Sequence, residues 1–312
     1  MASYTLLPGL SMSLITEHAL RLGADPETAV TVHHSGGRMT DLINALRAWN
    51  DHGGYLRAAE RLGVPRDEAE DLWWLLRSRH LLVAADALPG SGAGGILAVS
   101  QEALALAYRR DSSAGTVLAR RRGHRVLVNG AGELSARLCE ELRRSGVGRV
   151  WSGADHRHGI PTFSIVVNAS QPPSLTAKAH RRRGLPHLVV DSLEGSVYIG
   201  PLVVPGRTPC IHCVELHCRD EHPEWSRARF GEAPDTTVEA ALEALAVAVT
   251  TTLALQHIDG EVVDGPTTLR MRPSMSMRRR EWPVHPLCRC VDQTATTGTT
   301  RIGAAPLAAL VG

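Results

Sequence analysis

The sequence lacks the features that would tie a protein to a polyanion, a membrane or a secretory route. Its 34 Lys and Arg residues nearly balance 32 Asp and Glu residues, for a net charge of +2. This balance excludes a strong electrostatic attraction to nucleic acid or to an anionic membrane. Aromatic residues are also scarce, at 4% of the chain. The first 20 residues lack a basic segment followed by a long apolar run, which is the pattern of a signal peptide. We expect a cytoplasmic protein whose partners include neither nucleic acid nor a membrane.

Long apolar runs and cysteines are also scarce. The most apolar segment, residues 238–258, has about 15 uncharged residues in a row, which is too few to span a bilayer. Six cysteines in 312 residues do not make a disulfide scaffold. Four of them form two close pairs, a spacing that indicates a metal site in a reducing compartment.

The order of the predicted elements divides the chain into two domains. Residues 1–84 are predicted to contain strands at 13–16, 19–22 and 28–33, helices at 41–49, 55–62 and 65–79, and an extended segment at 80–83. This order predicts a winged-helix domain, whose first helix we expect Thr40 to cap. Residues 85–124 are predicted to be a linker with one helix, and residues 125–312 an α/β domain with a mostly parallel sheet.

A winged helix raises the question of DNA binding. The predicted third helix begins Arg66-Asp67-Glu68-Ala69-Glu70-Asp71, which puts four carboxylates at the end that would face the phosphates. We therefore expect no DNA binding, although a winged-helix regulator with a ligand-sensing domain stays as one alternative. The others are a packing domain without a partner and a domain that binds a peptide by strand addition.

The second domain begins with a glycine turn between a strand and a helix. The strand 125–129 is followed by Gly130-Ala131-Gly132 and then by apolar residues at helical spacing. The helix N-terminus after such a turn is the usual position for a phosphate group. However, Ser135 replaces the third glycine of the dinucleotide pattern, and Glu133 adds a negative charge beside that position. A structural turn without a ligand is the alternative interpretation.

The two cysteine pairs are the most specific motif of the chain. Cys210 and Cys213 form a C-x-x-C, and Cys288 and Cys290 form a C-x-C. Two such pairs supply opposite edges of a tetrahedral zinc site. Since no ligand position is left open, we predict a structural zinc ion. A redox role for the first pair is the main alternative, and His217 or Cys218 are alternative ligands with poorer spacing.

Three later segments carry further expectations. A strand is predicted at 195–204 with Gly200 as a bulge, and another at 267–277, where apolar and polar residues alternate. A long Ala/Leu/Val helix is predicted at 235–258. Because its apolar residues cover most of its circumference, we expect it in the core or at a homodimer interface.

These motifs together resemble the ThiF/MoeB family. The resemblance rests on the glycine-turn segment 130–150, the strand 162–168, the segment 200–213 and the closing HPLCRC at 285–290. It implies a ubiquitin-activating-like fold, ATP- and Mg-dependent adenylation of a C-terminal carboxylate, and zinc held by the four cysteines.

Within this family, residues 205–227 and the N-terminal domain are most similar to the ThiF-like "F" proteins of azole-forming peptide clusters. This similarity implies a PqqD-like peptide-recognition element ahead of the ThiF-like domain. Such proteins bind the leader of a ribosomally made precursor peptide and present its core to a separate YcaO cyclodehydratase, which uses ATP to form azolines.

The chain departs from the adenylating members at their acidic positions. The loop 152–159 offers one carboxylate, Asp155, and Asn168-Ala169-Ser170-Gln171-Pro172 stands where those members have D-A-T-D-N. Because Mg-ATP chemistry needs anionic metal ligands, we expect that adenylation is lost and that neither ATP nor Mg²⁺ is used. Gly130 and Gly132 would then be remnants of a cofactor site; an active adenylating enzyme is the alternative.

The resemblance leads to a non-catalytic, leader-binding partner of a YcaO cyclodehydratase as the predicted function. The leader is expected to add a strand beside residues 28–32 and to pack against the third helix. The expected contacts are Thr28, Ala29, Val30, Thr31 and Val32 on the strand, and Leu72, Leu75, Leu76 and Arg79 on the helix.

Overall fold

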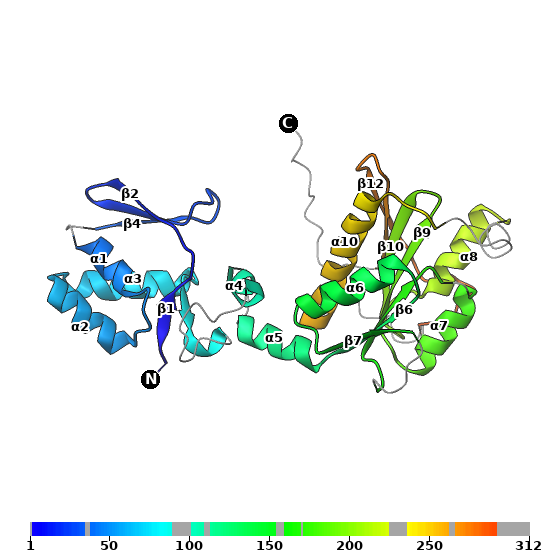
Figure 1. The fold of residues 1–312 in the computed structure, drawn as a ribbon, viewed down its shortest axis with the longest axis horizontal. Coiled ribbons are helices and arrows are strands. Elements are labelled where there is room, and N and C mark those ends of the chain that lie inside the picture. Colours follow the sequence, from blue (N-terminus) through cyan, green and yellow to red (C-terminus); the bar gives the residue numbers. More distant parts are fainter. Residues whose placement is uncertain are drawn as a thin grey trace. The chain divides into compact units, whose positions relative to one another are not determined.

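The computed structural model describes residues 2–34, 38–88, 101–108, 113–153, 159–169, 171–224, 236–261 and 266–291. The chain forms two compact units, residues 1–123 and 124–312 (Figure 1).

The first unit combines a small antiparallel sheet with helices. Its strands are β1 (Tyr4–Leu6), β2 (Met12–Thr16), β3 (Ala19–Leu22), β4 (Val30–His33) and β5 (Leu82–Ala84). Strands β2, β3 and β4 form a three-stranded sheet in that order, and β1 pairs with β5. The helices are α1 (Met39–Ala45), α2 (His52–Leu62), α3 (Arg66–Ser78), α4 (Gln101–Tyr108) and α5 (Ala114–Gly123). The order of three strands, three helices and a returning strand matches the sequence-based expectation. The three-residue β1 was missed because it is too short to show a period.

Several boundaries in this unit differ from the predicted ones: α1 ends at Ala45 rather than at residue 49, and α2 begins at His52 rather than at residue 55. Helix α1 begins at Met39, so Thr40 lies inside it rather than capping it. Strand β4 begins at Val30 rather than at Thr28, because the residues before it form a turn in which the Thr28 hydroxyl donates to Asp25 Oδ2 at 3.2 Å.

One hydrophobic core holds the first unit together. Trp73, Tyr55 and Leu20 are among its buried side chains, and the core extends to Leu106 and Leu118 on α4 and α5. The buried Arg121 on α5 pairs with Glu102 on α4 at 2.6 Å. The segment 85–124, predicted as a linker with one helix, therefore contributes two packed helices, while residues 89–100 of the glycine-rich part lie outside the described residues.

The second unit is built on a seven-stranded sheet with the order β12-β11-β10-β9-β8-β6-β7. Its strands are β6 (Arg125–Asn129), β7 (Arg149–Ser152), β8 (Phe163–Val167), β9 (His187–Leu193), β10 (Ser196–Val203), β11 (Thr267–Met271) and β12 (Met277–Glu281). Strands β7, β6, β8 and β9 pair in parallel, whereas β9 to β12 pair antiparallel. The sheet is thus mixed rather than mostly parallel. The segment 267–277, predicted as a single strand, contains β11, the hairpin turn and the first residue of β12.

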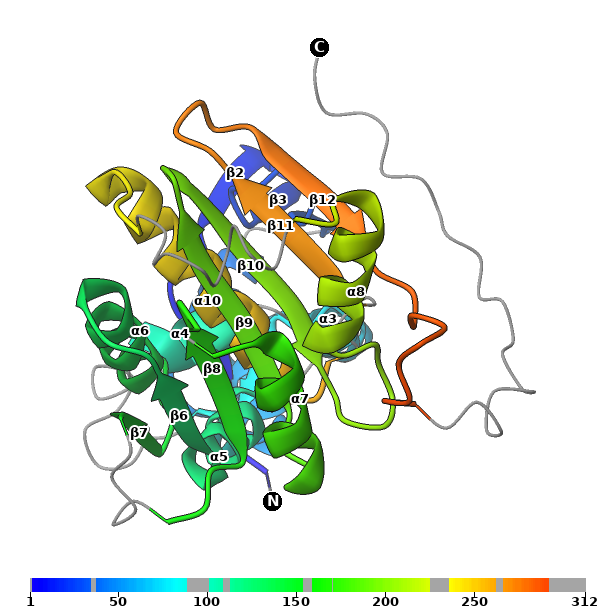
Figure 2. The same ribbon diagram turned by 90° about the vertical axis from the view of Figure 1, so that its right-hand side faces the viewer.

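Helices cover both faces of this sheet. Helices α6 (Glu133–Arg144) and α10 (Ala240–Asp259) pack against each other, as do α7 (Pro173–Arg182) and α8 (Ile211–Glu221). The two pairs lie on opposite faces of the sheet (Figures 1 and 2). The predicted bulge is present in β10, where the pairing register with β9 shifts between Ile199 and Leu202. A side chain at Gly200 would come within 2.0 Å of the Thr267 carbonyl oxygen, so only glycine fits there.

Helix α10 corrects an expectation about membranes. With a mean hydropathy of 1.4 over its most apolar part, it is long and apolar enough to cross a bilayer. In the structure it packs against α6, β9 and β10, and Ala246, Ala254 and Ile258 are buried in the core of the second unit. Because it is partly buried in this core, its length and apolar composition are weak evidence for a membrane span.

A buried histidine should make the second unit sensitive to acid. Burial lowers the pKa of His187 to about 3, and the neighbouring His180 acts in the same direction. An unfolded histidine titrates near 6.5, so below that pH the unfolded chain binds a proton that the folded chain does not. Stability therefore falls as the pH drops below about 6.5, and this group alone should cost about 1.4 kcal/mol at pH 5.5.

His187→Asn tests this prediction. The imidazole Nδ1 donates to the Leu185 carbonyl oxygen at 3.1 Å, and an Asn amide can keep that bond without titrating. Urea unfolding at pH 7.5 and 5.5 should show a pH-dependent loss about 1.4 kcal/mol smaller in the variant. Equal losses in the two proteins would contradict the assignment.

Candidate functional site

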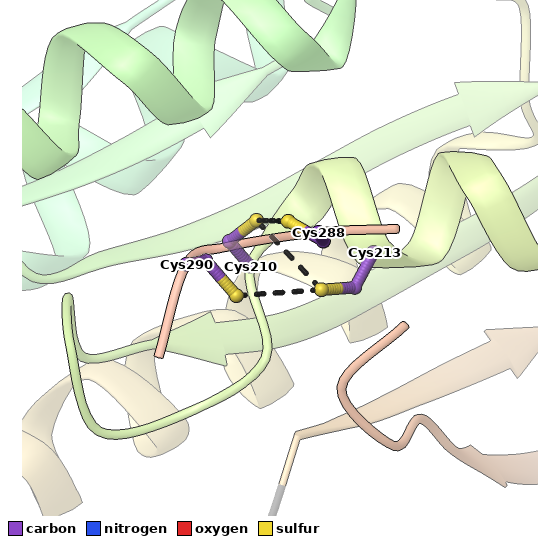
Figure 3. Close-up of side chains that lie close together, drawn as sticks. All are labelled: Cys210, Cys213, Cys288 and Cys290. Carbon is purple, nitrogen blue, oxygen red and sulfur yellow. Dashed lines mark hydrogen bonds between the residues drawn. The ribbon is translucent and has the colours of Figure 1, made fainter. Parts of the chain in front are cut away.

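Four cysteine sulfurs form a buried cluster in the second unit (Figure 3). Cys210 Sγ lies 4.0 Å from Cys213 Sγ and 3.6 Å from Cys288 Sγ, and Cys213 Sγ lies 3.4 Å from Cys290 Sγ. All four side chains are at least 90% buried. The sequence-based grouping of these residues is therefore confirmed.

Each pair is positioned by a different part of the chain. Cys210 is the N-cap residue of α8, and Cys213 lies one turn further on the same helix. Cys288 and Cys290 lie in the segment after β12, which Arg181 fastens by donating to the Arg289 carbonyl oxygen at 2.5 Å. The cluster thus ties the start of α8 to a segment about 75 residues later in the chain.

The spacing of the sulfurs fits a tetrahedral metal ion. Zn–S bonds of about 2.3 Å place the sulfurs of a tetrahedral site about 3.8 Å apart. The distances of 3.4–4.0 Å agree with that value and are far longer than the ~2.05 Å bond of a disulfide. All four cysteines are free thiols. The four residues would hold zinc without leaving a ligand position open, which makes its role structural.

Hydrogen bonds among the thiols and their burial shift the pKa values of Cys210, Cys213 and Cys288. The thiols of Cys210 and Cys290 donate to Cys213 Sγ and hold the pKa of Cys213 well below its usual range. Burial raises the pKa of Cys288 to about 12; Cys213 and Cys290 add to the effect, whereas the hydrogen bond with Cys210 opposes it. A bound Zn²⁺ would replace these protons and convert the thiols to thiolates.

The alternative ligands are not part of the cluster. His217 Nε2 bonds to the Pro283 carbonyl oxygen at 3.2 Å, and Cys218 lies outside the sulfur group. His217 does lie beside Asp220 and His285. Both ring nitrogens of His285 are occupied, since Nδ1 accepts from the Leu287 N–H at 3.1 Å and Nε2 lies 2.8 Å from Asp220 Oδ2. The contact between His285 and Asp220, which holds the segment just before Cys288, could not be predicted from the spacing of residues in the sequence.

Both glycines of the turn, Gly130 and Gly132, are required by the local backbone structure. A side chain at Gly130 would come within 2.7 Å of Val167 on the adjacent strand. Gly132, the N-cap residue of α6, has φ = 87°, which favours glycine. Ser135 is buried on α6, and Glu133 lies in the first turn, where its charge suits the helix dipole. These contacts explain the turn without a nucleotide.

The loop after β8 also has a structural role. Asn168 adopts a left-handed backbone conformation with φ = 47°, and its Oδ1 accepts the Ser192 N–H at 2.6 Å. Asp155, the single carboxylate of the loop 152–159, lies outside the described residues.

The expected peptide-contacting residues fall into three environments. Thr28 and Ala29 lie in the turn before β4, and Val30, Thr31 and Val32 lie on β4 itself. Leu72 and Leu76 are buried in the core, whereas Leu75 is half-buried and packs against it. Arg79 is exposed and caps the end of α3. Sequence reasoning missed Trp74, which is 55% exposed on the same helix.

Comparison with protein-family models and with curated protein sequences finds no match. Comparison with solved structures finds a heterocyclase in complex with substrate and cofactor, at 17% identity and a TM-score of 0.69, over 94% of this chain and 40% of that one. The heterocyclase TruD matches at 15% identity and a TM-score of 0.69, over 99% of this chain and 46% of TruD. This chain thus spans less than half the length of either heterocyclase.

MccB from E. coli matches over nearly its whole length. Its complex with AMPCPP and MccA has 13% identity and a TM-score of 0.64, over 93% of this chain and 99% of MccB. At such low identities these similarities show the fold alone: the chain is an α/β protein with a mixed sheet that shares the fold of MccB.

The metal centre makes a prediction about composition and stability. Purified protein should contain one zinc per chain by elemental mass spectrometry, and Cys213→Ser should lose it, because three ligands hold the ion more weakly than four. Loss of the ion should lower stability by about 3 kcal/mol or more and the melting temperature by ~10 °C. Cys218→Ser is the matched control and should keep both. A zinc-free native protein would contradict the assignment.

Proposed function

We propose that the chain is a non-catalytic protein that binds the leader of a ribosomally made precursor peptide and presents it to a YcaO cyclodehydratase. The first unit is the peptide-binding, winged-helix element, and the second is the scaffold. The site of action is the cytoplasm. The observation that carries the proposal is the outer edge of β4, with which no strand among the described residues pairs.

Strand β4 is an edge strand of the three-stranded sheet among the described residues. Val30 and Val32 point into the core, and Thr31 and His33 are exposed. The His34 N–H donates to the His18 carbonyl oxygen in the same register that pairs Leu20 with Val32. Since hydrogen-bonded pairs alternate along an antiparallel ladder, Val30 and Val32 bond to β3, and the backbone groups of Thr31 and His33 point away from it. An extended peptide can pair with these groups.

Specificity would come from side chains that line the added strand. Leu72 and Leu76 are buried and stabilise the core. Leu75 is half-buried, so part of its side chain is accessible to a peptide. We therefore narrow the proposed contacts to the backbone of β4 together with Leu75 and Arg79.

The absence of catalysis is supported by the substituted acids. Asn168 and Gln171 stand where adenylating members have the two acids of D-A-T-D-N, and the Asn168 side chain accepts a hydrogen bond from the Ser192 N–H. A Mg²⁺ ion would lack these carboxylate ligands. The likeness in fold to TruD and to MccB bound to MccA supports a place in peptide modification. The structure of MccB with ATP, at 12% identity and a TM-score of 0.64, favours the second candidate, an active adenylating enzyme.

Strand addition is tested by a proline at β4. Thr31→Pro removes an outward N–H that leader pairing needs and leaves the ladder with β3 intact, because proline is tolerated on edge strands. Fluorescence polarisation of the full chain, against labelled leader peptides from short reading frames beside its gene, should show binding at least about tenfold weaker in this variant.

Thr31→Ala is the matched control, since it keeps the N–H and should keep the affinity. Circular dichroism should show the same fold in all three proteins. Tight leader binding by Thr31→Pro, or no binding by the unaltered chain, would contradict the proposal.

A further inference from the structure

A pocket of about 580 Å³ lies in the second unit, on the face of the seven-stranded sheet that α7 and α8 cover. This volume lies within the range of about 300–1,000 Å³ typical of ligand sites. Its wall on α8 repeats at helical spacing through Ile211, Val214 and Cys218, and its other apolar lining includes Tyr198 and Trp282. The proposed function uses none of this surface.

The floor of the pocket is a row of residues in register across four strands. Asp191 on β9 pairs with Tyr198 on β10, Tyr198 pairs with Arg270 on β11, and Arg270 pairs with Arg278 on β12. All four line the pocket. Residues directly opposite on paired strands point to the same face, so two arginine side chains stand next to each other at its rim.

The other two arginines of β12 are compensated. Arg280 makes a two-pronged ion pair with Glu221 and lies over the Trp282 ring, 3.8 Å from its centroid. Arg279 lies 3.5 Å from Glu281. Arg270 and Arg278, in contrast, make no ion pair within the part of the chain that the structure describes.

No acidic side chain in the described parts of the chain pairs with Arg270 or Arg278. The Arg270 guanidinium lies over the Tyr198 ring at 5.3 Å, and its Nε is buried without a hydrogen-bond partner among those residues. Like charges directly opposite each other on paired strands are destabilising. An anionic group bound between them would remove this repulsion and satisfy Nε.

The neighbouring strand edge favours a peptide as the ligand. Strand β12 is at the edge of the described sheet. The Trp282 N–H donates to the Pro266 carbonyl oxygen, so by alternation Arg278 bonds to β11, while the backbone groups of Arg279 point outward. An extended chain can pair there while a side chain enters the apolar pocket.

We propose that this pocket binds an acidic segment of the precursor peptide, with an apolar side chain among Ile211, Val214 and Trp282 and a carboxylate on Arg270 and Arg278. The inference rests on the proposed function for the source of the peptide. It adds a second binding site, in the second unit, that is chemically distinct from the edge of β4.

The test uses the full chain and a fluorescein-labelled hexapeptide, Glu-Asp-Leu-Phe-Asp-Glu, in fluorescence polarisation. Its matched probes are Lys-Lys-Leu-Phe-Lys-Lys, which lacks the carboxylates, and Glu-Asp-Gly-Ser-Asp-Glu, which lacks the apolar anchor. The acidic apolar probe should bind at least about tenfold more tightly than either. Arg278→Glu, on an exposed strand, should weaken its binding about tenfold or more, and Arg272→Glu, the same charge change outside the pocket, should leave it within about twofold.

Three results would overturn the inference: no binding of the acidic apolar probe, equal binding of all three probes, or equal effects of the two charge reversals. A competition experiment tests whether the bound segment belongs to the precursor peptide: unlabelled precursor should displace the probe, and inorganic phosphate should not. Displacement by phosphate alone would overturn the peptide assignment. Thr31→Pro should lose leader binding yet keep the probe, so the two proposals fail separately.

Discussion

The cluster of four cysteine sulfurs is the constraint on which the second unit depends. Cys210 begins α8, and Cys290 lies near the end of the described chain, so the cluster closes a loop of about 80 residues that contains α10 and the β11–β12 hairpin. Closing a loop of this size in the unfolded chain is entropically costly, and a metal clip offsets that cost through its binding free energy. The bracing contacts of Arg181 with Arg289 and of Asp220 with His285 hold the second pair in place. The pocket beside α8 owes its wall to the same arrangement.

The sequence predicted the features that depend on local rules. Alternation and turn residues located β2 and β3, helical spacing located α2 and α3, and the spacing of two cysteine pairs located the cysteine cluster. Features that depend on distant contacts were missed. The antiparallel pairing of β10 with β11 is a matter of tertiary structure that periodicity does not encode, and so the sheet was expected to be mostly parallel. The amphipathic pattern of α3 placed Leu72 and Leu76 inward, as observed, but such a pattern fits a core and a groove equally well and did not separate core leucines from peptide contacts.

The glycine turn shows how a nucleotide-site scaffold can serve the fold alone. Gly130 lets β6 and β8 approach, Gly132 starts α6, and Asn168 links the end of β8 to β9. Each residue has a packing or hydrogen-bonding reason to be there. These structural roles of the turn are compatible with the proposed absence of Mg-ATP chemistry.

We propose above all that this chain, which shares the fold of MccB, binds a peptide without activating it. Isothermal titration of Mg-ATP into the full chain, with and without the leader peptide, combined with ATP–pyrophosphate exchange on the same samples, tests it most directly. The account predicts no saturable heat from ATP, no exchange, and leader binding of the same affinity in the presence and absence of nucleotide. Saturable ATP binding with pyrophosphate exchange that depends on the peptide would contradict it and make the chain an adenylating enzyme.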